Sequence, residues 1–200
     1  MSMKYIFKPA ITLLITAVIT VALLSVVYNF TKEPIEKQKR RTQEEAMREV
    51  LPKASDYREM ETELSGSIVA IYEGLYISEA LTDDVLIGYV IMLSPEGYSG
   101  NIDIVVGIYL GEGKISGMRV LRHTETPGLG ALAVKEDFYS RYEGLPFGQL
   151  TVVRSSPGEN EIQAITSATI TTRAITNAIN EAIEWCNKWN SINEEEEGEE

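Results

Sequence analysis

Residues 102–122 read IDIVVGIYLGEGKISGMRVLR, two apolar runs separated by a glycine-rich segment. The first run extends from Ile102 to Leu110 and the second from Ile115 to Arg122, and both have the residue composition of strands. The intervening Gly111-Glu112-Gly113 is typical of a turn. The segment therefore predicts two antiparallel strands joined as a hairpin.

The same glycines superficially resemble a dinucleotide-binding loop over 111–117. Such a loop opens a helix, whose N-terminus holds the pyrophosphate. Here the glycines lie between two β-like runs and no helix follows. A hairpin turn is the favoured interpretation.

Three further short runs with β character precede the hairpin, at 68–72, 75–81 and 85–93. Turn signals separate them, including Glu73-Gly74 and Pro95-Glu96-Gly97. Helices are predicted over 134–142 and, with an apolar face at helical spacing, over 171–189. The sum is an α+β domain in which a mostly antiparallel sheet is closed by packed helices.

The N-terminal part predicts a membrane span. Residues 9–28 contain no charged side chain, and about 20 apolar residues cover the hydrocarbon core of a bilayer. A charged helical segment follows as far as Leu51-Pro52. The expected organisation is a stub (1–8), a transmembrane helix (9–30), a helical connector (31–52), one domain (53–190) and an acidic disordered tail (191–200).

Overall composition excludes two classes of function. The formal net charge of -12 and the absence of a Lys/Arg cluster argue against nucleic-acid binding, which needs a basic surface. The single cysteine, Cys186, cannot form an intrachain disulfide or supply the thiolates of an iron–sulfur cluster. A redox centre in this chain would therefore be organic or belong to a partner.

The charges beside the span predict an orientation. Two lysines precede it, whereas Lys32, Lys37, Lys39, Arg40 and Arg41 follow it. The positive-inside rule, applied alone, predicts that the main domain is cytoplasmic.

The segment 122–130, RHTETPGLG, predicts a restricted loop after a strand. Pro127 fixes its own φ and restricts Thr126, while the glycines allow close backbone approach. Such a loop would form one wall of a pocket for a planar ligand. His123, the only histidine, is interpreted as a loop residue without a metal or catalytic role.

Five hydroxyl residues crowd the segment 162–172, IQAITSATITT, which leads into the last predicted helix. They suit N-capping, in which Ser and Thr oxygens accept the first free N–H groups of a helix. They also suit phosphate binding, because a helix N-terminus attracts anions. From this segment alone, N-capping is the favoured interpretation.

Together, three segments resemble the FMN-binding domain family. Residues 166–169, Thr-Ser-Ala-Thr, are similar to its flavinylation motif, Asp-x-x-(Ser/Thr)-Gly-Ala-(Thr/Ser); residues 125–130 and 97–102 resemble two further family segments. The resemblance implies that Thr169 carries FMN through a phosphoester and that Thr166, Ser167 and Ala168 form its recognition segment. It also implies that four loop residues lie near the flavin: Glu125, Thr126, Gly128 and Leu129.

Two positions depart from the motif. Gln163 stands where the motif has Asp, and Ser167 stands where it has Gly. Ser167 is a small substitute. Gln163 replaces the acidic residue that the family's flavin transferase is thought to read, and Glu161 is a candidate for compensation.

Within that family the chain most resembles the G subunits of Rnf complexes. The resemblance implies an electron-carrier subunit, without independent catalytic activity, of a ferredoxin:NAD⁺ oxidoreductase that moves Na⁺ or H⁺. It further implies integral and iron–sulfur partner subunits, a flavin transferase, and a single-pass position in the cell (inner) membrane with the FMN domain extracytoplasmic. The alternatives are the C subunit of the Na⁺-translocating NADH:quinone reductase, or an FMN-binding sensory or assembly module outside a pump.

Overall fold

The computed structural model describes residues 4–77 and 84–197. The predicted strand over 75–81 therefore lies partly outside the described residues, as do the ends of the predicted stub and tail. The chain divides into two units, residues 1–43 and 44–200, and each is described by itself.

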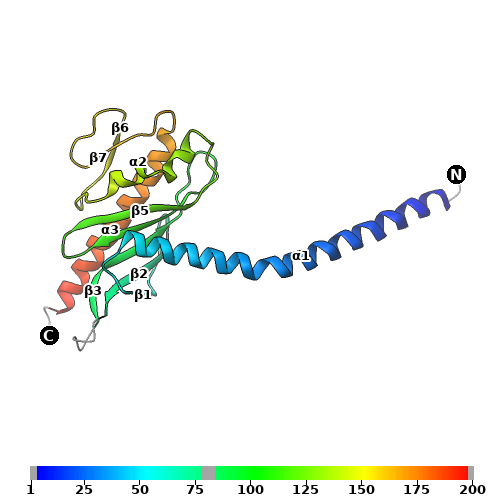
Figure 1. The fold of residues 1–200 in the computed structure, drawn as a ribbon, viewed down its shortest axis with the longest axis horizontal. Helices are drawn as coiled ribbons and strands as arrows, with labels where there is room; N and C mark the ends of the chain where they lie inside the picture. The colour runs from blue at the N-terminus through cyan, green and yellow to red at the C-terminus, as the bar shows by residue number, and fades with distance from the viewer. Residues whose placement is uncertain (1–3, 78–83, 198–200) are drawn as a thin grey trace. The chain divides into compact units, whose positions relative to one another are not determined.

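The first unit consists of most of helix α1 (Lys4–Val50), which includes the predicted span and most of the predicted connector (Figure 1). The helix continues through Pro9 and Pro34, although a proline has no N–H to donate within a helix. Its large apolar side chains between Ile11 and Phe30 are exposed. By length and composition, α1 is able to cross a membrane.

The second unit is built on a five-stranded antiparallel sheet of order β1-β2-β3-β4-β5. The predicted hairpin is confirmed: the last two strands pair, and Gly113 N donates to Leu110 O at 3.1 Å in the turn. The α+β fold class is likewise confirmed. The strands are β1 (Asp56–Glu59), β2 (Ile68–Tyr76), β3 (Val85–Leu93), β4 (Asp103–Tyr109) and β5 (Lys114–Arg122).

The turn predicted at Glu73-Gly74 is wrong, because β2 continues through it with a register shift between Gly74 and Leu75. A Cβ added to Gly74 would lie 2.2 Å from Leu51 Cδ2. Glycine here gives room for the Leu51 side chain against the strand and does not make a turn. Strand β1 was not predicted, since its sequence DYRE is polar and mostly exposed.

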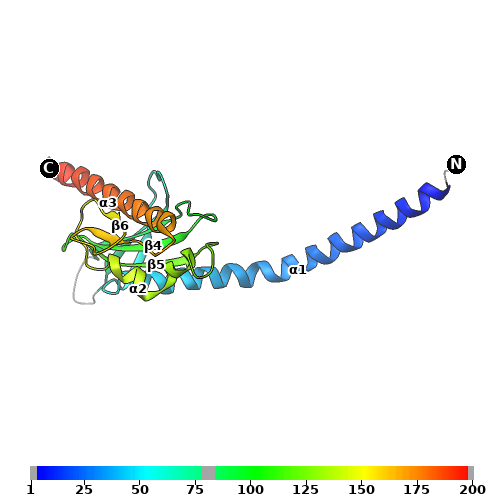
Figure 2. The ribbon, with the colours of Figure 1, turned by 90° about the horizontal axis from the view of Figure 1, so that it is seen from above.

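Helix α3 (Thr169–Glu197) covers one face of the sheet (Figures 1 and 2). It starts two residues before the predicted position and is helical as far as Glu197, through most of the tail expected to be disordered. Its apolar side chains, among them Ile175, Ile179 and Ile183, pack with inward-facing residues of all the longer strands. This is the main core of the domain.

The last turns of α1 cover the opposite face of the sheet (Figure 2). Met47, Val50 and Leu51 pack with Val90, Met92 and Val105, which alternate along β3 and β4 with residues of the main core. Because both faces are covered, these two strands are nearly continuous apolar runs.

Short elements connect β5 to α3. The helix predicted over 134–142 is a succession of three turns, and a two-stranded parallel pair follows. Strands of three residues are too short to give a periodic signal, so this pair was not predicted. The elements are η1 (Gly130–Val134), α2 (Glu136–Tyr139), η2 (Ser140–Tyr142), β6 (Thr151–Val153) and β7 (Glu161–Gln163).

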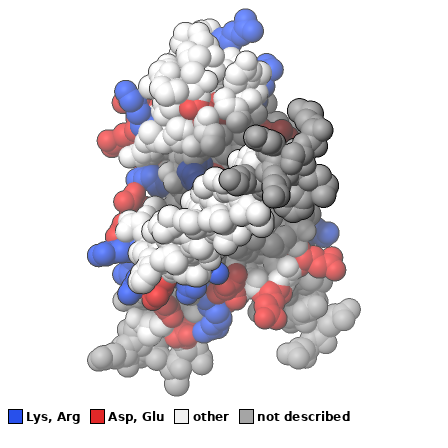
Figure 3. Space-filling model, turned by 90° about the vertical axis from the view of Figure 1, so that its right-hand side faces the viewer, with Lys and Arg blue, Asp and Glu red and all other residues white. Residues whose placement is uncertain are grey.

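Charged side chains of both signs are interspersed on the face shown in Figure 3. Among the described residues on that face, no continuous basic area is present. The net charge of the chain is -12.

Candidate functional site

The start of α3 is set by a tight turn that follows β7. Ala168 N donates to Ile165 O at 2.9 Å, and Ser167 adopts a left-handed conformation with φ of 65°. Thr172 N then donates to Ala168 O at 3.1 Å, which is the first helical hydrogen bond. The left-handed position explains why glycine suits the motif there, because a Cβ is disfavoured at positive φ.

The hydroxyls inside the first turn of α3 hold the surrounding segments together. Thr172 Oγ1 accepts from Ile165 N at 3.1 Å, and Thr171 Oγ1 donates to Glu125 Oε2 at 2.7 Å. The residue that precedes the helix is Ala168, whose side chain has no acceptor. The favoured N-capping interpretation is therefore not what the junction shows, and the first N–H groups of α3 remain available to an anion.

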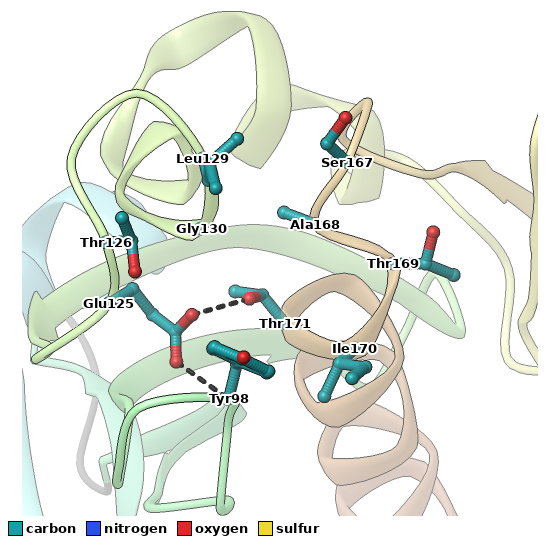
Figure 4. Close-up of a pocket in the computed structure, with 10 residues that line it drawn as sticks. All are labelled: Tyr98, Glu125, Thr126, Leu129, Gly130, Ser167, Ala168, Thr169, Ile170 and Thr171. Atoms are coloured by element: carbon teal, nitrogen blue, oxygen red, sulfur yellow. Dashed lines mark hydrogen bonds between the residues drawn. The ribbon is translucent and has the colours of Figure 1, made fainter.

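Thr166, Ser167 and Thr169 differ from Thr171 and Thr172. Their hydroxyls form no hydrogen bond with another residue in the described part of the chain. Thr169 is half-buried, and Figure 4 shows its hydroxyl and that of Ser167 pointing outward from the turn. These hydroxyls are free to take a ligand or a modification.

Glu125 joins the second predicted loop to the same place. It is 5% exposed, and its Oε1 accepts from Tyr98 N at 2.8 Å and from Ser99 N at 3.0 Å. Its backbone N–H donates to His123 Nδ1 at 3.2 Å, so the only histidine orients this loop. Two segments of the family resemblance, 97–102 and 125–130, thus meet at one carboxylate, which also binds the helix that follows the third.

Two glycines leave room for that carboxylate. A Cβ on Gly97 would lie 2.4 Å from Glu125 Oε1, and one on Gly130 would lie 2.2 Å from Oε2. Gly128 has a positive φ of 78° and turns the loop before Leu129. Glycine at 97 and 130 is therefore a steric requirement of the buried acid.

A cavity of about 410 Å³ lies between these segments (Figure 4). Leu129 and Ala168 point toward each other across it, and Tyr98 and Ile170 add exposed apolar surface. Glu125 is the only charged residue among the ten that line the cavity: Tyr98, Glu125, Thr126, Leu129, Gly130, Ser167, Ala168, Thr169, Ile170 and Thr171.

Six of the eight expected site residues line this cavity, whereas Thr166 and Gly128 do not. Gly128 is exposed just before Leu129. Tyr98, Gly130, Ile170 and Thr171 were not named as site residues. Tyr98 lies in a segment that had carried the resemblance, and Thr171 in the hydroxyl cluster. The hydrogen bond between Thr171 and Glu125 joins residues 46 apart in sequence and has no local signal.

Thr166 lines a neighbouring cavity of about 310 Å³ together with Gln163 and Asp137. Arg141 Nη1 donates to Gln163 O at 2.5 Å on this side of the turn. Glu161, proposed above to compensate for Gln163, accepts from Gly158 N at 2.8 Å. Asp137 is thus a second acidic residue close to Gln163, supplied by α2.

The main cavity suits a planar ligand that carries a phosphate. Its walls are largely apolar, its volume lies in the range of ligand sites, and one end is the N-terminus of a long helix. The lining residues include no Lys or Arg, so the helix N-terminus would supply the positive potential.

Comparison with known proteins gives two family matches along the chain. The model described as "FMN-binding domain" matches residues 97–184, and the model described as "RnfG N-terminal region" matches residues 1–50. The first match contains all the residues that line the main cavity. The second contains the part of α1 that is able to span a membrane.

Relatives match over most of their length. The G subunit of an ion-translocating oxidoreductase complex from Methanosarcina acetivorans is 30% identical, with 91% of this chain and 95% of the relative covered. The G subunit of the Na⁺-translocating ferredoxin:NAD⁺ oxidoreductase complex of Acetobacterium woodii is 31% identical, with coverages of 90% and 91%. A proton-translocating counterpart from Clostridium ljungdahlii is 39% identical over 49% of this chain and 52% of its own.

Matches along both the helix and the domain, in one order and at nearly full length, lead to one conclusion. The chain belongs to the RnfG family, the G subunits of ion-translocating oxidoreductase (Rnf) complexes.

Proposed function

We propose that this chain is an electron-carrier subunit of a membrane-bound ferredoxin:NAD⁺ oxidoreductase that couples electron transfer to Na⁺ or H⁺ movement, and that its FMN is esterified to Thr169. One observation carries the proposal: a hydroxyl without a protein partner stands at the N-terminus of a long helix, beside a largely apolar cavity. Relatives with Na⁺ and with H⁺ in their names are both similar, so both ions remain in the proposal.

The residues present fit FMN. Its phosphate would lie at the first turn of α3, where unpaired N–H groups and the helix dipole favour an anion. Its ring system would lie against apolar side chains such as Leu129, Ile170 and Tyr98. When bound, FMN supplies the ability to accept and release one or two electrons.

The chain's own residues bind and orient in this proposal. Thr169 would hold the phosphate covalently, which prevents loss of the cofactor, and the loop 125–130 would form the opposite wall. Both carboxylate oxygens of Glu125 already accept hydrogen bonds from the protein. No residue is assigned as a general acid or base, and we expect no catalytic activity from the isolated chain.

The proposed partners are the integral and iron–sulfur subunits of the complex and a flavin transferase. Thr166 and Ser167 are exposed, so the recognition segment is accessible to a modifying enzyme. With Gln163 in place of the motif's acid, we propose that Asp137 supplies the nearby negative charge. Copurification of the chain with polytopic subunits would separate a pump component from a sensory module.

The chain is membrane-anchored through α1, and we propose that the domain is extracytoplasmic. The five basic residues after the span favour the opposite side. Ser191→Cys would place a reactive group on the exposed surface of α3, while Cys186 is buried and silent. A membrane-impermeant thiol reagent should label this cysteine in intact cells. Labelling only after permeabilisation would place the domain in the cytoplasm.

In-gel flavin fluorescence tests the covalent attachment. The chain is produced in its native host, denatured and separated by electrophoresis. Wild type and Ser167→Ala should fluoresce at the mass of this protein, because the Ser167 hydroxyl is not the proposed acceptor. Thr169→Ala should be dark. Fluorescence that persists in Thr169→Ala would contradict Thr169 as the attachment residue. Fluorescence lost only in Ser167→Ala would assign the attachment to Ser167 instead.

A further inference from the structure

We infer that Glu125 is a positioning residue that clamps the 97–99 loop to the first turn of α3, and that its unneutralised charge lowers the reduction potential of a flavin held beside it. The inference deepens the proposed function and rests on it for the flavin. The Glu125 clamp is defined here as the hydrogen bonds from Tyr98 N, Ser99 N and Thr171 Oγ1 to the carboxylate.

The first step is geometric. The carboxylate accepts from two backbone groups of one loop and from a side chain at the third position of α3. All three distances lie between 2.7 and 3.0 Å, within the normal range of hydrogen bonds. These three hydrogen bonds connect the loop that carries Tyr98 to the helix that carries Thr169.

The second step concerns space. Gly97 and Gly130 approach the two carboxylate oxygens so closely that neither position has room for a Cβ. Thr124 Oγ1 donates to Ser99 O at 3.1 Å. This hydrogen bond is a second link between the 97–99 loop and the loop that carries Glu125. The site is therefore built around the acid, and a larger or displaced side chain at 125 would move the cavity walls.

The third step concerns charge. Oε1 accepts from two backbone N–H groups, an arrangement that suits a carboxylate. No Lys or Arg of the described chain forms a salt bridge with it, and the cavity lining includes no cation. The helix N-terminus offsets the charge only in part. A negative charge next to a redox group opposes the addition of electrons.

Variants of the full-length chain separate the clamp from the charge. Glu125→Gln keeps the size and removes the charge, so the midpoint potential of the covalent flavin should become more positive in a redox titration. Glu96→Gln removes an exposed charge two residues from Tyr98 and is the matched control, with no expected shift. An unchanged potential in Glu125→Gln would overturn the electrostatic part.

Hydrogen exchange tests the clamp without relying on the flavin. In Glu125→Ala the Tyr98 and Ser99 amides lose their acceptor, and their exchange should accelerate by about tenfold or more, as expected for hydrogen bonds to a charged group. Exchange in Glu96→Ala should match wild type. Should Glu125→Ala fail to fold, Thr171→Val removes one donor and keeps the charge. It should accelerate amide exchange less than Glu125→Ala is expected to, and it should leave the midpoint potential of the flavin nearly unchanged.

The outcomes are distinguishable from failure of the proposed function. Wild-type protein without flavin at Thr169 would refute the proposed function, yet the exchange measurement would still report on the clamp. Unchanged amide exchange in both Glu125→Ala and Thr171→Val would refute the clamp even if the flavin is present.

Discussion

The two faces of the sheet are covered in different ways. On one face, side chains of α3 pack against those of β2 to β5. On the other, the last turns of α1 bring backbone against backbone: a Cβ on Gly107 would lie 2.2 Å from Val50 O, and the Ser116 hydroxyl donates to the same carbonyl. Side-chain packing alone thus holds α3, whereas the end of α1 combines side-chain packing with a close backbone approach that Gly107 permits.

A large-to-small change on the buried face of α3 should have the greatest effect on stability. Ile179 is fully buried in the main core, and Ile179→Ala should lower the free energy of unfolding by about 2–5 kcal/mol through lost burial and a cavity. Chemical denaturation of the detergent-solubilised chain measures it. Val69→Ala, on an exposed part of β2, is the control with little expected effect. Equal losses would contradict the assigned core.

A small-to-large change under α1 should have the next largest effect. Gly107→Ala forces the new Cβ against Val50 O and should cost about 1–3 kcal/mol in the same measurement. Gly111→Ala meets nothing within 4 Å and should be close to neutral. If Gly107→Ala is as stable as Gly111→Ala, the close contact between Gly107 and the Val50 carbonyl is not formed.

The turn at the head of α3 should respond weakly and with the opposite sign. Ser167→Gly relieves a left-handed residue and should raise the free energy of unfolding by about 0.5–1 kcal/mol, after the greater flexibility of unfolded glycine is subtracted. Ser167→Val should lower it, because a β-branched residue tolerates this conformation poorly. Thermal unfolding of the two variants decides the order; a reversed order would contradict the left-handed turn.

At neutral pH the smallest expected effect is at Cys186, on the buried side of α3. Burial raises the pKa of its thiol to about 12, so the reactive thiolate is scarce at neutral pH. A maleimide should leave the folded chain unlabelled and modify it after unfolding. Since the unfolded thiol ionises first, near pH 9, this residue's contribution to stability should decrease as pH rises from about 9 to 12. Rapid labelling of the folded chain would contradict the packing.

The sequence predicted the parts of the fold that have local signals. The apolar run after Pro9, the hairpin at Gly111 and the amphipathic helix ending the domain follow from periodicity and turn chemistry. It misread Gly74, because a glycine that admits Leu51 and a glycine that makes a turn look alike in sequence. The short parallel pair β6–β7 has too few residues to give a pattern.

For the site, the family resemblance implied that the loop 125–130 and the segment 166–169 lie near one flavin, but the hydrogen bonds that join them were not predicted. The hydrogen bond between Glu125 and Thr171, and the position of Tyr98 beside the cavity, depend on tertiary contacts between distant segments. N-capping was favoured because sequence alone does not reveal that Ala168 precedes the helix while the nearby threonines bond elsewhere.

Mass mapping of the natively produced chain tests the central proposal most directly. After proteolysis, the peptide that contains Thr169 should carry the added mass of one esterified FMN, with fragmentation placing it on that residue. The same peptide from Thr169→Ala should be unmodified. The proposed ester at Thr169 would be contradicted if all of the wild-type peptide lacked the added mass in a host whose complex is assembled and active.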